Sequence, residues 1–146
     1  KKKSGNSLGK NGKTNMDTKK DIRSRYDIDR FIRLFYERVK ADKTIGIIFT
    51  EIVAINWEKH IPLIIDFWET ILLDNPVYNH NAMDAHYALN RVYPLRKEHF
   101  DAWLNLFNTT LDEMYSGEKA SLAKQRALSI ALLMQHKMNP EKTNSI

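Results

Sequence analysis

The sequence predicts an all-α protein. Apolar residues recur at intervals of three and four along successive segments, which places them on one face of a helix. No segment alternates apolar and polar residues as a half-buried strand would, and no repeat or hairpin signal competes. The 146 residues favour one domain with a sizeable core, and the hydrophobic content of 42% is ordinary for a globular protein.

The first expected helix begins at Asp27, a residue type that caps helix N-termini. Its apolar stripe consists of Ile28, Phe31, Ile32, Phe35 and Val39. Tyr36 follows Ile32 by one turn, so we expect its phenol to project toward the same interior. In the segment that follows, Gly46 breaks the helical pattern and places Phe49 at a corner.

A second helix is predicted from Asn56, which can cap its N-terminus. Pro62 removes one helical hydrogen bond, so we expect an irregularity near the first turn. One stripe of this helix, which is expected to enter the core, is apolar except for a histidine: His60, Ile64, Phe67 and Ile71. A buried imidazole must hydrogen-bond a partner, or border a cavity or a ligand, and a lone histidine in such a place is more often structural.

Three further segments complete the predicted fold. A polar loop follows residue 73, and a short helical piece after it carries His86. A long helix that ends at Gly117, a residue type that suits a C-terminal stop, has these residues facing inward: Phe100, Trp103, Leu104, Phe107 and Leu111. In the last helix, small alanines that let a neighbouring helix approach closely align with larger residues: Ala123, Ala127, Ile130 and Met134.

Composition excludes several classes of protein. The chain contains no cysteine, so disulfides and thiolate metal sites are excluded. No apolar run approaches the roughly 20 residues of a membrane span, and the lysine-rich N-terminus lacks the apolar segment of a secretory signal. We therefore expect a cytoplasmic protein that contacts no membrane. The formal charge of +5 comes from the first 20 residues, so it gives little support for nucleic-acid binding.

The same composition divides the chain into three parts. Residues 1–20 are rich in Lys, Gly, Ser and Asn and almost free of apolar residues, so we expect a disordered basic tail. Residues 21–138 are expected to form the folded helical domain, and residues 139–146 a flexible C-terminal tail.

Generic enzyme templates are missing from the sequence. There is no cysteine nucleophile, no glycine-rich phosphate loop and no HExxH zinc pair. What remains is a set of polar-tipped residues on inward faces of four segments: Tyr36, His60, His86 and Trp103. Each alone is more often a core residue or a locally bonded histidine, but burying all four without a shared partner is costly. A haem between the helices would account for them jointly, because one imidazole binds iron while the other polar groups surround a diatomic ligand.

The order of motifs resembles a group III truncated haemoglobin. The resemblance covers almost everything from Asp27 to Met134, and its most specific parts are Phe35-Tyr36, Ile45-Gly46 through Phe49, Trp57 three residues before His60, Phe67-Trp68, and His99-Phe100 leading to Trp103-Leu104. The glycine pairs that mark other truncated-haemoglobin groups are missing. The resemblance implies a shortened globin fold, in which two pairs of helices sandwich a b-type haem.

Residue roles follow from this resemblance position by position. His86 matches the proximal iron ligand, and Tyr36, His60 and Trp103 match the distal tyrosine, the distal gate histidine and the ligand-bonding tryptophan. The resemblance also implies a set of haem contacts: Phe49 at the haem edge, with Ile64, Phe67, Trp68 and Phe107 lining the pocket. Two departures from the family pattern matter. Ile47 stands where proline is common, and the segment between His86 and His99 is longer than in compact members, so the propionate contacts Tyr93, Arg96 and His99 are inferred from position alone.

The leading functional hypothesis is a haem protein that binds dioxygen, carbon monoxide and nitric oxide at an iron capable of five-coordination. The resemblance implies redox chemistry with nitric oxide or peroxide, supported by an unidentified reductase, rather than bulk oxygen transport, because strong distal donors slow ligand release. No catalytic residue is assigned. A haem-based gas sensor and a haem-free helical adaptor are the alternatives, and an intense Soret band separates the last of these from the others.

Overall fold

The computed structural model describes residues 19–52, 55–78 and 95–138. Every regular element in these ranges is a helix, which confirms the all-α prediction. The elements in chain order are α2 (Arg25–Ala41), η1, a π-helical turn (Ile48–Ile52), α3 (Trp57–Leu73), α5 (Lys97–Met114) and α6 (Glu118–Met138). None of the described helices is both long enough and apolar enough to cross a bilayer.

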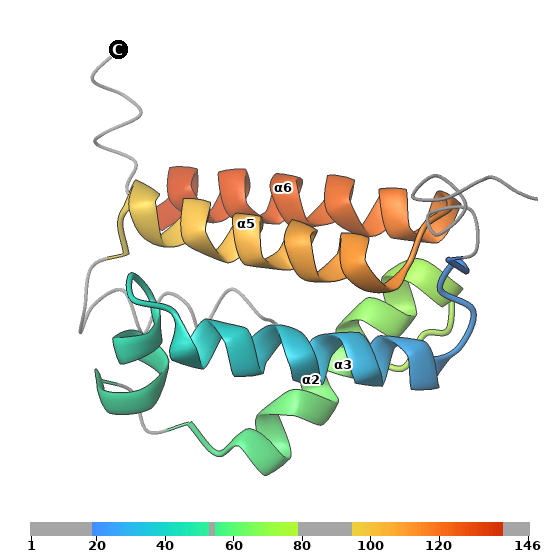
Figure 1. Cartoon of the computed structure of the whole chain (residues 1–146), viewed down its shortest axis with the longest axis horizontal. Helices are drawn as coiled ribbons and strands as arrows, with labels where there is room; N and C mark the ends of the chain where they lie inside the picture. The colour runs from blue at the N-terminus through green and yellow to red at the C-terminus, as the bar shows by residue number, and fades with distance from the viewer. Residues whose placement is uncertain (1–18, 53–54, 79–94, 139–146) are drawn as a thin grey trace, which may run out of the picture.

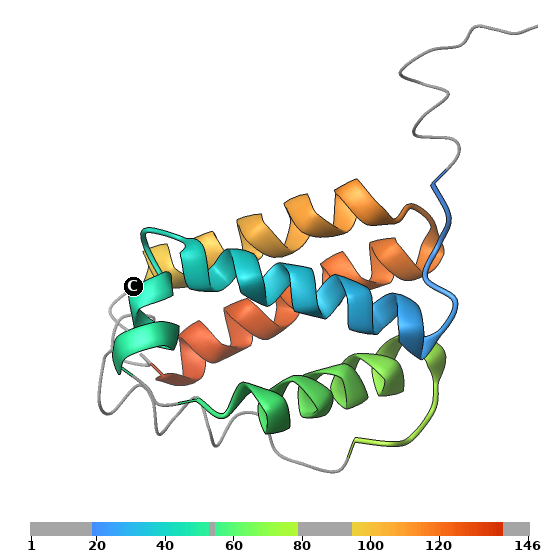
Figure 2. The same ribbon diagram turned by 60° about the horizontal axis from the view of Figure 1, so that its bottom comes forward.

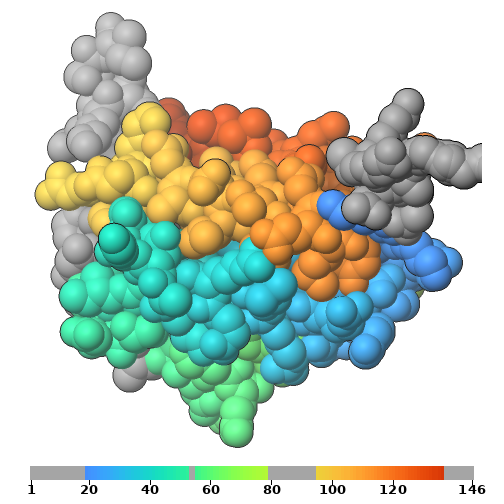
Figure 3. All heavy atoms as spheres, in the orientation of Figure 1, coloured from blue at the N-terminus to red at the C-terminus, as the bar shows by residue number. Residues whose placement is uncertain are grey.

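The four long helices form two stacked pairs. Helices α5 and α6 lie side by side in one layer, and α2 and α3 form the other (Figure 1). Between the layers, α2 packs on α5 and α3 packs on α6, as the turned view in Figure 2 also shows. The side chains of α2 and α5 meet along the length of the molecule (Figure 3). This two-over-two arrangement is the one expected for a truncated globin.

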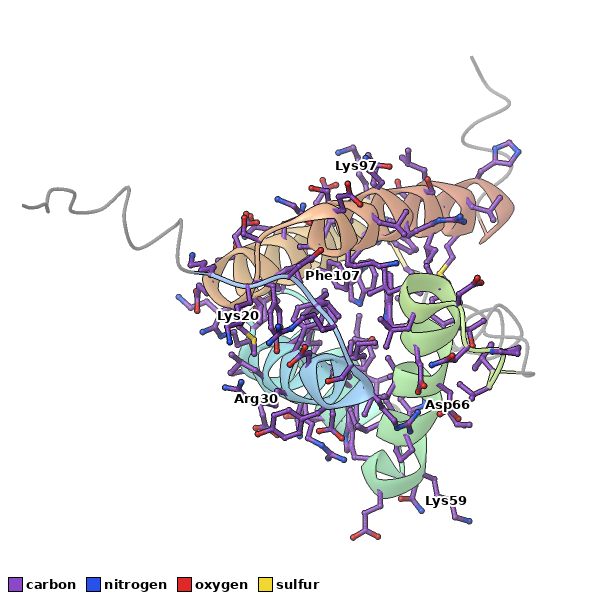
Figure 4. The ribbon with its side chains drawn as sticks, turned by 90° about the vertical axis from the view of Figure 1, so that its right-hand side faces the viewer. Lys20, Arg30, Lys59, Asp66, Lys97 and Phe107 are labelled. Carbon is purple, nitrogen blue, oxygen red and sulfur yellow. The ribbon has the colours of Figure 1, made fainter. Side chains whose placement is uncertain are left out.

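The core is aromatic where α2 crosses α5. The predicted α2 stripe is buried as expected, at Ile28, Phe31, Ile32, Phe35 and Val39. Phe107 of α5 is fully buried and points between the two layers (Figure 4). Its ring meets Phe31 and Phe35 edge-on, with centroids 5.0 and 5.3 Å away, an arrangement that adds to the hydrophobic gain of burial.

Two of the predicted helix boundaries are wrong. Ser24 rather than Asp27 is the N-cap of α2, because the Ser24 hydroxyl accepts from the Asp27 N–H while the Asp27 carboxylate accepts from the Arg23 N–H. Asp27 therefore lies in the first turn of the helix, where the positive end of the helix dipole stabilises a carboxylate. Helix α5 ends at Met114 with Tyr115 as its C-cap, so Gly117 does not end it.

Gly117 instead precedes α6 and gives room to a long-range cap. The Asp21 carboxylate accepts from the N–H groups of Lys119 and Ala120, at 2.8 and 2.9 Å, at the start of α6. A Cβ built on Gly117 would lie 2.5 Å from the Asp21 Cγ, and the Gly117 φ of 143° also disfavours other residues. Close approach of the Asp21 side chain therefore requires glycine here.

The boundary of α3 is confirmed, whereas its buried face is not the one predicted. The Asn56 side chain accepts from the Lys59 N–H, and the helix continues through Pro62. The fully packed face consists of Ile61, Ile65, Trp68 and Leu72. The predicted stripe of His60, Ile64, Phe67 and Ile71 lies about 100° away around the helix and is only half-buried.

The buried stripe of α6 and the break in the helical pattern at Gly46 lie close to their predicted places. In α6 the buried stripe is Ala120, Ala123, Ala127, Ala131 and Met134, so Ala131 replaces the half-buried Ile130. At the corner before η1, a Cβ on Gly46 would lie 2.5 Å from the Lys40 carbonyl oxygen, which explains the glycine that interrupts the helical pattern.

Charged side chains join α2 to both of its neighbours. The Arg25 guanidinium lies 2.7 Å from the carboxylates of Asp66 and Glu69 on α3. The Arg38 guanidinium donates to Glu113 and to the buried Thr110 hydroxyl on α5. Each ion pair is partly exposed, so solvent screens it and its contribution to stability is small.

Candidate functional site

Tyr36 is a buried polar group of the predicted site. It lies in the last turns of α2, is 9% exposed, and packs against the rings of Phe35, Phe49 and Trp57 at centroid distances of 4.6, 6.2 and 5.6 Å. Burial raises the pKa of Tyr36 to about 12, and a hydrogen bond from the Trp103 side chain lowers it by a smaller amount. The phenol therefore keeps its proton throughout the physiological range.

Trp103 approaches Tyr36 from the opposite layer. An indole can only donate, so the hydrogen bond between these side chains runs from the Trp103 N–H to the Tyr36 oxygen. The indole stacks on Phe107, with centroids 5.4 Å apart and planes 23° apart, and meets Phe35 edge-on. This packing fixes the ring, although Trp103 itself is only half-buried.

The half-buried stripe of α3 contributes further residues to the neighbourhood of Tyr36. His60 lies in the first turn, where its ring meets Trp57 edge-on at a centroid distance of 5.7 Å. Ile64 and Phe67 continue the stripe and pack against the core while keeping some accessible surface. Phe49 of η1 contacts both Tyr36 and Trp57, at 6.2 Å in each case, so it belongs to the same neighbourhood.

Two residues predicted to contact a cofactor lie in the core of the described structure. Trp68 is 3% exposed and Phe107 is fully buried, and their rings lie 5.1 Å apart between α3 and α5. Their packing supports Trp103 and Phe67, whose rings they contact directly.

The predicted propionate contacts that are described lie at the start of α5. The buried imidazole of His99 accepts the Arg96 N–H through Nδ1 at 2.8 Å. A neutral His99 therefore carries its proton on Nε2. Arg96 is exposed at the helix start.

Trp57 is a central member of this group, although only its spacing from His60 pointed to it in the sequence. Its ring contacts Tyr36, Phe49 and His60, and the Lys40 ammonium lies 5.0 Å from its centroid. The available signal was its place three residues before His60, because residues three apart are neighbours on a helix surface.

Comparison with known proteins identifies the family. No family model matches the chain. The curated protein "Group 3 truncated hemoglobin ctb" of Campylobacter jejuni is 33% identical over 112 residues, which is 75% of this chain and 86% of the relative. The chain belongs to the group III truncated haemoglobins. A crystal structure of a group III truncated haemoglobin from Campylobacter jejuni superposes with a TM-score of 0.71, at 31% identity, over 83% of this chain and 95% of that one.

Membership of the group III truncated haemoglobins makes this a globin-type haem protein of a gas-binding class. The described residues fit such a cofactor. Side chains from four elements combine partly accessible apolar surface with the polar groups of a buried tyrosine, a half-buried histidine and a half-buried tryptophan: Tyr36, Phe49, His60, Ile64, Phe67 and Trp103. Such apolar surface suits a flat apolar cofactor, and the polar groups suit a small polar ligand bound to it. His86 and Tyr93 lie outside the described residues.

Proposed function

We propose that this truncated haemoglobin binds haem b, with His86 as the iron ligand, and uses it to bind dioxygen and other diatomic gases for redox chemistry. The observation that carries the proposal is the buried phenol of Tyr36, joined by a hydrogen bond to the half-buried indole of Trp103 within an apolar aromatic setting. Haem, when bound, supplies the iron that holds a gas and exchanges electrons with it.

Tyr36 is the proposed principal donor to the bound gas. Its raised pKa keeps the phenol protonated, and the Trp103 N–H donates to the phenol oxygen. A donor at that oxygen polarises the O–H bond and strengthens the hydrogen bond that Tyr36 gives. The Tyr36 hydroxyl would thereby stabilise a gas ligand that carries partial negative charge, in a setting that excludes water.

The remaining candidate residues have supporting roles in this proposal. His60 lies on the half-buried flank of α3, where an imidazole can control access to Tyr36. Phe49, Ile64 and Phe67 would contact the haem, and Trp68 and Phe107 would hold these contacts from behind. The assignment of Tyr93, Arg96 and His99 to the propionates stays a prediction.

Strong distal donors favour redox use of the gas over delivery, because they slow its release. We propose nitric oxide oxidation by dioxygen, or reduction of peroxide, as the reaction, with a reductase as the source of electrons. Either reaction needs a retained ligand and a pocket from which water is excluded.

A spectroscopic series tests the cofactor and its ligand. The purified chain is expected to show an intense Soret band, and ferrous and carbon-monoxide forms with five- and six-coordinate spectra. The His86→Gly variant should lose stable haem and regain a five-coordinate spectrum when imidazole is added. His136→Ala, at an exposed position on α6, serves as the control and should match the wild type.

Two results would overturn the assignment. A colourless protein that takes up no haem would leave a helical adaptor as the function. An unchanged ferrous spectrum in the His86→Gly variant would instead assign another ligand, with His80 as the next candidate. Nitrate formation from nitric oxide and dioxygen, measured with a chemical reductant, tests the redox role separately.

A further inference from the structure

Trp57 occupies a position between the proposed gate and the proposed ligand donor. It is the first residue of α3, and its indole contacts His60 on its own helix and Tyr36 on α2. The ring centroids lie 5.7 Å from His60 and 5.6 Å from Tyr36. The ring of Phe49, on η1, lies 6.2 Å from the Trp57 ring centroid. One indole therefore contacts both His60 and Tyr36.

Lys40 holds the indole from the other side. Its ammonium lies 5.0 Å from the Trp57 ring centroid, which is within the range of a cation–π interaction. The Glu37 carboxylate lies 2.9 Å from the same ammonium, one turn back along α2. The Lys40 side chain is 27% exposed, so the cation is partly shielded from water over the ring. The last turn of α2 is thus joined to the first turn of α3.

The contact between Trp57 and His60 restricts the imidazole. The two residues are three apart in one helix, so their side chains are neighbours on its surface. Their planes meet at 76°, with one ring edge against the other ring. Rotation of the imidazole toward Trp57 is blocked while the indole stays in place. Moving the indole requires breaking its contact with Lys40.

We propose that Trp57, held by Lys40, is a positioning residue that sets the orientation of His60 and limits the access of small ligands and water to Tyr36. The inference rests on the proposed function, because the ligand is a diatomic gas bound beside Tyr36. Lys40 acts through Trp57 and need not touch the ligand. The Glu37 carboxylate keeps the ammonium over the ring.

The test measures carbon monoxide association after flash photolysis of the haem-loaded chain. Lys40→Met removes the cation from the ring, so association should accelerate by about two- to fivefold. Lys40→Arg keeps a cation that can stack on the indole, and it should retain the wild-type rate. Trp57→Leu should accelerate association further. In the Trp57→Leu background, Lys40→Met should then have no additional effect.

A second measurement does not depend on haem. Tyrosine ionisation is followed by ultraviolet absorbance of the full chain up to pH 11, and any ionisation gained in Trp57→Leu is assigned to Tyr36 by its absence in the Trp57→Leu, Tyr36→Phe double variant. Burial holds the pKa of Tyr36 at about 12 in the wild type. In Trp57→Leu, water gains access to the phenol, so one additional tyrosine should ionise below pH 11.

The outcomes separate this inference from the proposed function. Wild-type association rates in both Lys40→Met and Trp57→Leu, with haem bound normally, would overturn the role of Trp57 and leave the haem assignment intact. An unchanged tyrosine titration in Trp57→Leu would equally count against it. A chain that binds no haem would overturn the proposed function, and the titration would still decide whether Trp57 shields Tyr36.

Discussion

The Trp103 indole N–H donates to the Tyr36 phenol oxygen across the boundary between the two helical layers. Both rings also contact Phe35, at 5.6 and 4.6 Å, so the pair is held on a shared aromatic support. This geometry leaves two ways for Trp103 to act. The indole either polarises Tyr36 alone or shares its hydrogen with a bound gas, and ligand kinetics can separate the two.

We expect Trp103→Phe to accelerate dioxygen dissociation. The change keeps most of the ring volume and removes a buried hydrogen bond worth roughly 1.5–3 kcal/mol to a partly charged group, or about ten- to a hundredfold in rate. Carbon monoxide is less polar when bound and should respond less. The same change in a Tyr36→Phe background is the matched control. If Trp103 acts only through Tyr36, it then has no further effect.

Equal small changes for both gases, together with a lower melting temperature, would contradict this role. Trp103 would then be a packing residue, as its stacking on Phe107 alone would suggest.

Stability should fall at alkaline pH because of Tyr36. Burial raises the pKa of Tyr36 to about 12 in the folded chain, whereas an unfolded tyrosine ionises near pH 10. Below pH 10 neither state is ionised, so the group does not affect stability there. Between pH 10 and 12 only the unfolded chain releases the proton, and the free energy of unfolding falls by about 1.4 kcal/mol per pH unit.

Urea unfolding at several pH values between 9 and 11 measures this effect. The Tyr36→Phe variant lacks the titrating group, so the wild type should lose stability relative to it above pH 10. A difference that stays constant with pH would show that Tyr36 ionises as readily in the folded chain as in the unfolded chain.

His60→Ala should speed ligand association while retaining a large share of dioxygen affinity. The imidazole lies on the half-buried flank of α3, while Tyr36 and Trp103 remain as donors. Stopped-flow measurement of association and dissociation tests both parts. If dissociation accelerates more than in Tyr36→Phe, the roles of His60 and Tyr36 are reversed.

Asp21→Ala should destabilise the fold through α6. The carboxylate bonds two N–H groups at the start of that helix, and loss of such a cap costs about 1–2 kcal/mol. Asp21→Asn retains one acceptor and should cost less. The control is Asp29→Ala, which removes an exposed ion pair with Arg33. Equal losses of unfolding free energy for Asp21→Ala and Asp29→Ala would contradict the capping role.

Removing residues 1–18 should leave the thermal midpoint and the Soret spectrum nearly unchanged, because this segment offers almost no apolar side chains. Removing residues 1–20 should cost more, since the Lys19 ammonium donates to the Asp112 carbonyl and the Lys20 carbonyl accepts from the Ser116 N–H. A large loss of helicity or haem affinity in the shorter deletion would show that the segment packs after all.

Periodicity predicted which segments are helical but not always which face is buried. In α2 the apolar stripe is isolated by charged neighbours, so the pattern has one solution, and it is confirmed. In α3 two apolar stripes lie side by side. Ile64 and Phe67 belong to one stripe, and their neighbours Ile65 and Trp68 belong to the other. Only the positions of α2 and α6 decide that Ile65 and Trp68 are the buried members.

Caps were harder to predict than helices. Ser24 and Asp27 are both good N-cap residues and stand three apart, so local sequence cannot choose between them. The Asp21 cap of α6 spans 98 residues, and no local pattern indicates it. The four polar site residues were predicted from their inward helix faces and their roles from the family resemblance, whereas the bond between Tyr36 and Trp103 depends on the packing of two layers.

The aromatic cluster gives the protein an internal optical probe. The chain has three tryptophans, and all of them belong to one chain of touching rings, from Trp57 through Tyr36 and Phe35 to Trp103, and through Phe107 to Trp68. Tryptophan fluorescence therefore reports on this neighbourhood. A haem placed beside these rings would quench their emission by resonance energy transfer. The binding of added haem can therefore be followed as a decrease in tryptophan fluorescence.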